Sequence, residues 1–479
     1  MKIAKDCPLG PHLVRIYNDQ GTGALRTFMV DRHPEVMEAE PNDSRAAAQL
    51  TEKLPVIING QLERPVDDDC FEVNAEVGQW IIGEVICRRL GSPVDPALHL
   101  FDPDGVDVAF NHDTYGLDPL IAWQVKRAGR YVIEVAGFTY PPAADVRFTG
   151  AKAAVYRLLL THGPYARSAF PTAVKRGETN SVHLFGWNLG ESGNSIVADL
   201  DASGLAARSD FAWFAPSAIH NSIRVAADDL PQILEREPND RADLAQAIVA
   251  PCAVNGRISH AGDARYFRLT AKKSERLVIA IQSAALDFPL DPVLSIADSS
   301  GKQLLSADDT GPLQDPKVEW AAPADGQYLI QVADRYGKGG RECVYRLTVR
   351  PALPDFTATV DASAFVVQPG KSAEMTVTIA RQNGHALPLA VVLDKLPPGV
   401  SAPAGQVPPG GGAVKISISA APNAAPANVP IRAMIVSLDP DHPIARPAIF
   451  SIGADQLIPN TDSLWLTIPP VPPTSMPAQ

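Results

Sequence analysis

Two related stretches decide the fold: PEVMEAEPNDSRAAAQ, which begins at Pro34, and PQILEREPNDRADLAQ, which begins at Pro231. Both contain the pattern E-x-E-P-N-D, and subtracting 34 from 231 gives an offset of 197 residues between them. The correspondence continues along the chain, where SPVDPALHLFDPDG from Ser92 matches FPLDPVLSIADSSG from Phe288. A period this long indicates duplicated domains, because solenoid proteins repeat units of about 20–50 residues.

Short strand-like runs fill both copies. In the first copy they are WIIGEVI, ALHLFD, RYVIEVA and VYRLLL, which are rich in β-branched and aromatic residues and are bounded by Gly, Pro, Asp or Asn. A helical period is nowhere sustained beyond the segments RAAAQL and RADLAQAI. We therefore predict an all-β chain of tandem β-sandwiches, with two jelly-roll-like domains of about 120 residues that alternate with immunoglobulin-like domains.

The composition excludes several classes of protein. A hydrophobic fraction of 46% is ordinary for a folded protein and argues against disorder. The formal charge of −12 repels phosphate backbones, so we expect no nucleic-acid partner. No stretch approaches the roughly 18 apolar residues that span a membrane, and the N-terminal sequence MKIAKDCPLG lacks the apolar core of a secretory signal.

The five cysteines, Cys7, Cys70, Cys87, Cys252 and Cys343, cannot all pair within one chain. Buried free thiols are one expectation, because cysteine is commonly a small core hydrophobe. A bridge between Cys70 and Cys87, which lie on successive strand-like runs, is the alternative. The sequence leaves this choice open, but the absence of any CxxC pair excludes a zinc ribbon.

The ExEPND stretch of the first copy gathers oxygen-bearing side chains. Glu38, Glu40, Asn42 and Asp43 lie within six residues, and alternation along an extended segment places the first three on one face. The turn PVDDD at 65–69 precedes a strand-like run and adds further carboxylates. Calcium accepts six to eight oxygen ligands, so this crowding suits a calcium ion. The simpler alternative is that Asn42 and Asp43 cap the turn that follows them.

At ExEPND the chain resembles the bacterial pre-peptidase C-terminal (PPC) domain family, β-sandwich modules of secreted peptidases that are related to the collagen-binding domains of clostridial collagenases. The resemblance covers roughly residues 38–162 and 235–350. It rests on ExEPND, NG, an Asp-rich turn before Phe, DP, a G-x-Y strand and a closing YRL strand, in that order in both copies. It implies that the linker and the Asp-rich turn bind Ca2+. The implied ligands are Glu38, Glu40, Asn42, Asp43, Asp67 and Asp69 in the first copy and Glu235, Glu237, Asn239, Asp240 and Asp263 in the second.

The second copy departs from this pattern at one position. Arg265 stands where the first copy has Asp69. A guanidinium at this place can replace part of a cation's charge by pairing with carboxylates. The sequence therefore leaves open whether the second copy binds calcium.

The repeat also sets the expected domain boundaries. RTFMVDRHPEVM, which ends at Met37, matches the end of the segment between the copies, so we expect the chain to open inside a truncated domain whose missing part carries a signal peptide. The segment between the copies is similar to immunoglobulin-like IPT/TIG domains, and the segment after the second copy is similar to NEW3-type domains. The expected order is an IPT/TIG-type remnant at 1–37, PPC-like sandwich 1 at 38–164, an IPT/TIG-type domain at 165–234, PPC-like sandwich 2 at 235–352, a NEW3-type domain at 353–455 and a Pro-rich tail at 456–479.

Catalytic motifs are absent from the sequence, which contains no GxSxG, HExxH, P-loop or strand-to-helix GxGxxG. We therefore expect a non-catalytic, calcium-stabilised extracellular or cell-surface protein. Its expected partner is an extracellular polymer, either a collagen-like protein or a polysaccharide, or another surface protein. Two alternatives are the accessory C-terminal portion of a secreted peptidase or other hydrolase whose catalytic domain lies outside this chain, and a passive surface spacer.

Overall fold

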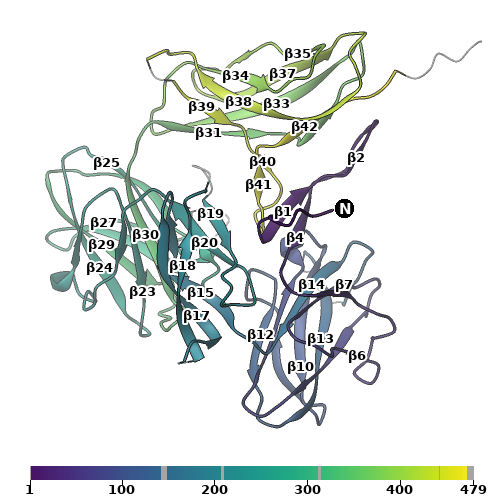
Figure 1. Cartoon of the computed structure of the whole chain (residues 1–479). Helices are drawn as coiled ribbons and strands as arrows, with labels where there is room; N and C mark the ends of the chain where they lie inside the picture. Colours follow the sequence, from purple (N-terminus) through teal and green to yellow (C-terminus); the bar gives the residue numbers. More distant parts are fainter. Residues whose placement is uncertain are drawn as a thin grey trace, which may run out of the picture. The chain divides into compact units, whose positions relative to one another are not determined.

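The computed structural model describes residues 2–141, 148–191, 193–205, 210–310, 314–441 and 443–471. They form strands, turns and three short 3-10 helices, η1 (Arg88–Leu90), η2 (Ala242–Leu244) and η3 (Ala284–Leu286) (Figure 1). The predicted all-β class is confirmed, and each helix in the described ranges is far too short to cross a membrane. Contacts divide the chain into two compact units. The first contains Met1–Gly10, Val30–Arg88 and Ser92–Ala352, and the second contains Pro11–Met29, Arg89–Gly91 and Leu353–Gln479.

The first sandwich has two five-stranded sheets. Its strands are β5 (Glu35–Met37), β6 (Gln49–Leu50), β7 (Val56–Gln61), β8 (Asp69–Ala75), β9 (Trp80–Ile86), β10 (Val94–Phe101), β11 (Asp107–Asn111), β12 (Leu120–Gln124), β13 (Gly129–Thr139) and β14 (Val155–Thr161). The sheet orders are β11-β10-β13-β8-β6 and β12-β9-β14-β7-β5. Side chains alternate along the strands, so Phe71, Leu98, Ile133 and Leu158 are fully buried in one core.

The second sandwich repeats this topology strand for strand. Its strands are β21 (Gln232–Leu234), β22 (Gln246–Ile248), β23 (Cys252–Arg257), β24 (Ala264–Ala271), β25 (Arg276–Gln282), β26 (Pro292–Asp298), β27 (Gln303–Ala307), β28 (Lys317–Ala321), β29 (Gly326–Asp334) and β30 (Val344–Pro351). The sheet orders are β21-β23-β30-β25-β28 and β22-β24-β29-β26-β27, which match the two sheets of the first sandwich position by position. The duplication read from the sequence is therefore present in the fold.

The strands β5 and β21 correct the predicted domain boundaries. β5 runs parallel to β7, and β21 runs parallel to β23 in the same way. Each linker before ExEPND therefore already belongs to a sandwich, because the neighbouring strand satisfies its backbone hydrogen-bonding groups. The sandwiches begin at Glu35 and Gln232, three residues earlier than the predicted starts at 38 and 235.

A smaller domain lies between the two sandwiches in the chain. Its strands are β15 (Tyr165–Phe170), β16 (Ala173–Lys175), β17 (Thr179–Leu189), β18 (Gly193–Asp201), β19 (Phe211–Phe214) and β20 (Ile223–Asp228). They form two three-stranded sheets, β15-β17-β18 and β16-β20-β19. Val174, Leu184 and Val225 are buried in its core, so this segment is a sandwich, as predicted.

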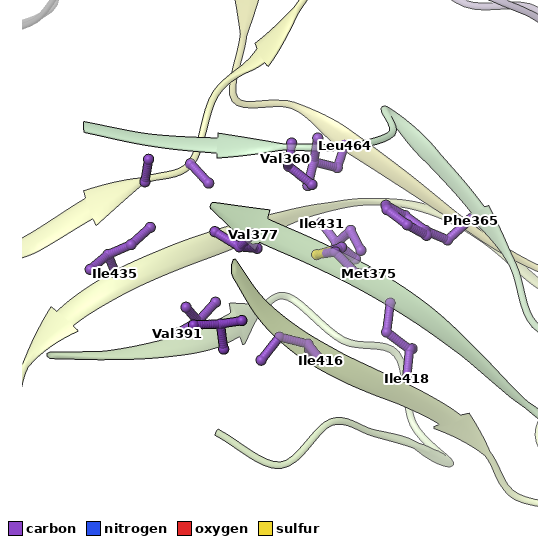
Figure 2. Packing of buried hydrophobic residues seen from close by; sticks show 14 of the residues in the cluster. Val360, Phe365, Met375, Val377, Val391, Ile416, Ile418, Ile431, Ile435 and Leu464 are labelled. Atoms are coloured by element: carbon purple, nitrogen blue, oxygen red, sulfur yellow. The ribbon is translucent and has the colours of Figure 1, made fainter. Parts of the chain in front are cut away.

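The third sandwich belongs to the second compact unit. Its strands are β31 (Asp355–Val360), β32 (Ala364–Val366), β33 (Ser372–Gln382), β34 (Leu389–Asp394), β35 (Val400–Ser401), β36 (Gly405–Gln406), β37 (Gly412–Ala420), β38 (Ala427–Ser437), β39 (Ala445–Pro447), β40 (Phe450–Ser451), β41 (Asn460–Thr461) and β42 (Leu464–Ile468). The main sheets have the orders β31-β33-β37-β35 and β32-β42-β38-β34-β36. Figure 2 shows Met375, Val377, Ile416, Ile431 and Leu464 packed in its core.

The predicted Pro-rich tail at 456–479 is wrong for its first part. β42 lies between β32 and β38, and Leu464, Leu466 and Ile468 are fully buried. The alternating LWLTI run supplies apolar side chains to the core, and this burial outweighs the prolines on either side of the run. Residues 472–479 of the predicted tail lie outside the described residues.

Residues 10–30 form two short hairpins, which pair β1 (Gly10–Val14) with β4 (Arg26–Val30) and β2 (Tyr17–Asn18) with β3 (Gly21–Thr22). The ring of Tyr17 lies 4.8 Å from the ring of Trp465 in β42. Residues 11–29 therefore group with the third sandwich, whereas the prediction treated 1–37 as one segment.

All five cysteines are free, and Cys70, Cys87, Cys252 and Cys343 are buried. The alternative bridge between Cys70 and Cys87 does not form, because Cys87 belongs to the core between the sheets, whereas Cys70 lies on the opposite face of β8 from the core residue Phe71 and contacts Glu134. Burial raises the pKa of the Cys252 thiol to about 11, so this group stays protonated at neutral pH.

Candidate metal centre

Glu38 follows β5 directly and is fixed against the neighbouring strands. Its backbone N–H donates to the carbonyl oxygen of Asn59 at 3.0 Å. Its Oε1 accepts the backbone N–H of Gln61 at 2.7 Å, and its Oε2 lies 3.0 Å from the hydroxyl of Tyr156 in β14. The pairing of β5 with β7 thus fixes the Glu38 carboxylate beside Gln61 and Tyr156, at the start of the ExEPND segment.

Gly60 makes room for this arrangement. A Cβ atom at this position would lie 2.2 Å from Tyr156 Oη and 2.4 Å from Glu38 Oε2. At the equivalent Gly256, a Cβ atom would lie 2.4 Å from Tyr345 Oη and 2.5 Å from a carboxylate oxygen of the linker. The repeated Asn-Gly pair is therefore a packing requirement, because only glycine leaves space for the glutamate and tyrosine side chains.

Three further carboxylates of the first copy converge beside Glu38. Oxygen atoms of Glu40, Asp67 and Asp69 lie within 4.8 Å of one another. Asp67 and Asp69 are buried, while Glu40 is exposed. Tyr156 joins the two groups, since its hydroxyl also lies 2.6 Å from Asp69 Oδ2. The linker and the Asp-rich turn thus bring four carboxylates together in one cluster.

Asn42 is fully buried at the same place. Its carbonyl oxygen accepts the backbone N–H of Cys70 at 3.0 Å, which ties the linker to β8. Among the described residues, neither Oδ1 nor Nδ2 of Asn42 has a hydrogen-bond partner, and the same holds for Oδ1 of Asp69. Buried polar atoms are almost always paired in folded proteins, so these atoms are available to a ligand.

The cluster is electrostatically unfavourable without a cation. Burial raises the pKa of Glu38, and burial together with the adjacent Glu38 carboxyl raises the pKa of Asp69. Arg64 offers partial compensation from the solvent side, because its Nη2 lies 2.7 Å from Asp43 and 3.3 Å from Asp67. Asp43 therefore pairs with an exposed arginine and does not join the three converging carboxylates.

The second copy holds a guanidinium where the first copy has an acid. Arg265 replaces Asp69, and it is 2% exposed. Its Nε lies 2.9 Å from Glu235, its Nη2 lies 3.1 Å from Glu237, and its Nη1 lies 3.4 Å from Asp263. These three acids are the counterparts of Glu38, Glu40 and Asp67. Asn239 is buried like Asn42, and Asp240 is exposed like Asp43.

The two clusters therefore differ in charge. With all four carboxylates ionised, as they would be around a bound cation, the first cluster carries −4, whereas three carboxylates and one guanidinium give the second −2. The difference equals the charge of one divalent ion. The oxygen donors of the first cluster suit a hard cation such as Ca2+, but the three carboxylates of the second are already paired with Arg265. Oδ1 and Nδ2 of Asn239 lack hydrogen-bond partners among the described residues, as do those of Asn42.

Sequence reasoning named the acids of both copies but missed Tyr156, whose hydroxyl bonds to two of them, and its counterpart Tyr345. These tyrosines come from the closing strands β14 and β30, far along the chain from the linkers. A signal was present, because both closing strands contain the triplet YRL at the same position of the repeat. A fully buried tyrosine repeated opposite a repeated glycine indicates a shared polar site.

The chain matches no family model. A probable subtilase-type serine protease of Deinococcus radiodurans is 32% identical over 114 residues, which make up 22% of this chain and 15% of the protease. The match thus spans a small part of that relative's length.

Two solved structures of a surface-layer protein align with this chain at low similarity. Domains 1–6 of surface layer protein SbsC give 11% identity and a TM-score of 0.15, covering 85% of this chain and 54% of that chain. The S-layer protein rSbsC(31-844) gives the same identity and TM-score and covers 85% and 55%. A TM-score this low carries no structural or functional argument.

Proposed function

We propose that the chain is a non-catalytic, secreted or cell-surface protein whose first sandwich is a PPC-type module that binds Ca2+. The observation that carries the proposal is the convergence of Glu40, Asp67 and Asp69 beside Asn42, a buried amide that has no partner in the described part of the chain. Calcium prefers oxygen ligands of this kind and is abundant outside cells.

The ion would hold the linker and the Asp-rich turn together; this calcium-dependent contact is called the clasp below. Glu38 and Glu40 belong to the linker that enters the sandwich, and Asp67 and Asp69 belong to the turn before β8. A divalent cation that contacts all four carboxylates holds the linker on the domain and reduces their mutual repulsion. Binding to the folded state alone also stabilises it by mass action, by about 2.7 kcal/mol at a calcium concentration one hundred times Kd.

The thermal melt of the purified chain in EDTA and in millimolar calcium tests this proposal. Glu40→Gln removes a carboxylate from the first cluster, and Glu237→Gln is the matched control at the equivalent position of the second copy. The expected result is a calcium-dependent rise in Tm for the parent and the control, and a reduced rise for Glu40→Gln. No rise in the parent, or an equal rise in all three proteins, would overturn the calcium site.

Limited proteolysis gives an independent reading of the clasp. With calcium bound, the linker at 36–43 should resist cleavage, and chelation should expose it, because the ion closes the contact between linker and turn. Equal cleavage rates in the two conditions would contradict the clasp even if calcium bound elsewhere.

For the biological role, we propose attachment to an extracellular polymer, either a collagen-like protein or a polysaccharide, or to a surface protein. The accessory portion of a secreted hydrolase is the second candidate, supported by the 114-residue match to a probable subtilase-type protease. Pull-down on collagen, cellulose, chitin and peptidoglycan tests attachment. Retention on one polymer supports it, and failure on all four would favour an accessory or spacer role.

A further inference from the structure

We infer that Arg265 takes the place of the divalent ion. The linker at 233–240 therefore stays bound to its sandwich without calcium, whereas the linker at 36–43 needs calcium to stay bound. This inference rests on the calcium site proposed for the first sandwich. It predicts that removal of calcium releases the first linker but not the second, although the two sandwiches have the same strand topology.

The contacts of Arg265 are those expected of a cation at the centre of the cluster. Its three guanidinium nitrogens reach Glu235, Glu237 and Asp263 at 2.9, 3.1 and 3.4 Å. Nε also donates to the carbonyl oxygen of Arg257 at 3.0 Å. The side chain is buried, so it fills the space between linker and turn that an ion would need.

Charge supports the same assignment. The exchange of an ionised Asp69 for Arg265 between the copies changes the formal charge of the cluster by +2, which is the charge that one calcium ion would add. An arginine keeps its proton throughout the accessible pH range. The positive charge in the second copy is therefore permanent, whereas a bound ion can leave.

The neighbourhood of the second linker is also closed by ion pairs. Arg346 in β30 pairs with Asp228, which ends the preceding domain just before β21, and the two side chains are 3% and 10% exposed. In the first copy Arg157 lies 3.8 Å from Asp31, the equivalent of Asp228, and pairs more closely with Glu35, at 3.0 Å. Each junction therefore holds an ion pair from its closing strand, but the acid is Asp228, just before β21, in the second copy and Glu35, the first residue of β5, in the first.

Reciprocal exchange of the two residues tests this inference. Arg265→Asp gives the second copy the missing carboxylate, and calorimetric titration with CaCl2 should then show two ions per chain where the parent binds one. Asp69→Arg should abolish calcium binding and protect the linker at 36–43 from protease in EDTA. Arg265→Gln, which removes the guanidinium without adding an acid, should expose the linker at 233–240 with or without calcium.

Each outcome has a definite meaning. Two ions bound by the parent, or a linker at 233–240 cut in EDTA as fast as the linker at 36–43, would overturn the inference. No second ion in a folded Arg265→Asp variant would also overturn it. If the parent binds no calcium but Arg265→Gln still exposes the linker at 233–240, the calcium proposal fails and the role of Arg265 as an internal cation stands. Should Arg265→Asp fail to fold, the cleavage pattern of the parent in EDTA decides alone.

Discussion

The hydroxyl of Tyr156 lies 2.6 Å from Oδ2 of Asp69, although the two residues are 87 positions apart in the chain. Tyr156 stands on β14 and Asp69 opens β8, so the contact joins the two sheets of the first sandwich. Burial raises the pKa of Tyr156, and the hydroxyl keeps its proton and acts as the donor. The closing strand therefore takes part in the site through a residue that carries no charge.

Tyr156→Phe should lower the free energy of unfolding by about 1–3 kcal/mol in EDTA, because a buried carboxylate loses its donor. Calcium should restore part of this loss, since a cation neutralises the carboxylate that the hydroxyl no longer serves. Urea denaturation with and without calcium measures both effects.

Tyr131→Phe is the matched control for that experiment. Its hydroxyl donates to the carbonyl oxygen of Arg127 at 2.9 Å, in the same sandwich but outside the cluster. The control should lose stability by an amount that calcium does not change. If calcium changed the stability of both variants by the same amount, Tyr156 would not take part in the calcium site.

Gly60→Ala should destabilise the first sandwich by about 1–3 kcal/mol, the usual cost of overpacking. The added methyl group would overlap Tyr156 Oη and Glu38 Oε2, and neither atom can move without losing its hydrogen bond. Gly326→Ala is the control, because a Cβ atom there meets no described atom within 4 Å. Thermal melts of the two variants should differ clearly; a Gly60→Ala variant as stable as the parent would refute the packing role of the Asn-Gly pair.

His220 should make stability depend on pH. Its Nδ1 lies 2.7 Å from Thr161 Oγ1, and its backbone oxygen lies 2.8 Å from His33 Nε2. Burial, with His33 and Arg32 nearby, lowers the pKa of His220. The unfolded chain therefore binds the proton more tightly, so the stabilising contribution is present above the ordinary pKa of about 6.5 and is lost as the pH falls through the lowered value.

The measurement is the free energy of unfolding of the parent and of His220→Gln between neutral pH and about pH 5. The advantage of the parent should shrink as the solution becomes more acidic. A difference that stays constant over this range would show that His220 does not titrate differently in the folded and unfolded states.

Leu466→Ala should cost about 2–5 kcal/mol, because the side chain is fully buried in β42 of the third sandwich. Leu353→Ala, at a position 68% exposed, should change stability by less than about 0.5 kcal/mol. Denaturant unfolding of the two variants compares them directly. If the two variants were equally stable, β42 would not contribute to the core, and the prediction of a Pro-rich tail from residue 456 would hold after all.

Sequence reasoning reached the carboxylates of the site because they lie close together in the chain. Glu38, Glu40 and Asn42 occupy one short linker, and their oxygen-rich chemistry is legible without a structure. Sequence reasoning did not predict the parallel strands β5 and β21. A three-residue strand has no periodicity of its own and forms only by pairing with its neighbour.

The sequence by itself determined the all-β class and the duplication, because strand periodicity and a 197-residue repeat are properties of the chain read in order. Only the tertiary structure decided that Tyr156 reaches Asp69, that β42 enters a core, and that the guanidinium of Arg265 meets three acids. These contacts join residues far apart in the chain, and their energies depend on burial and on distances between side chains. Local sequence carries the chemistry of each group, whereas the packing of strands selects which groups become partners.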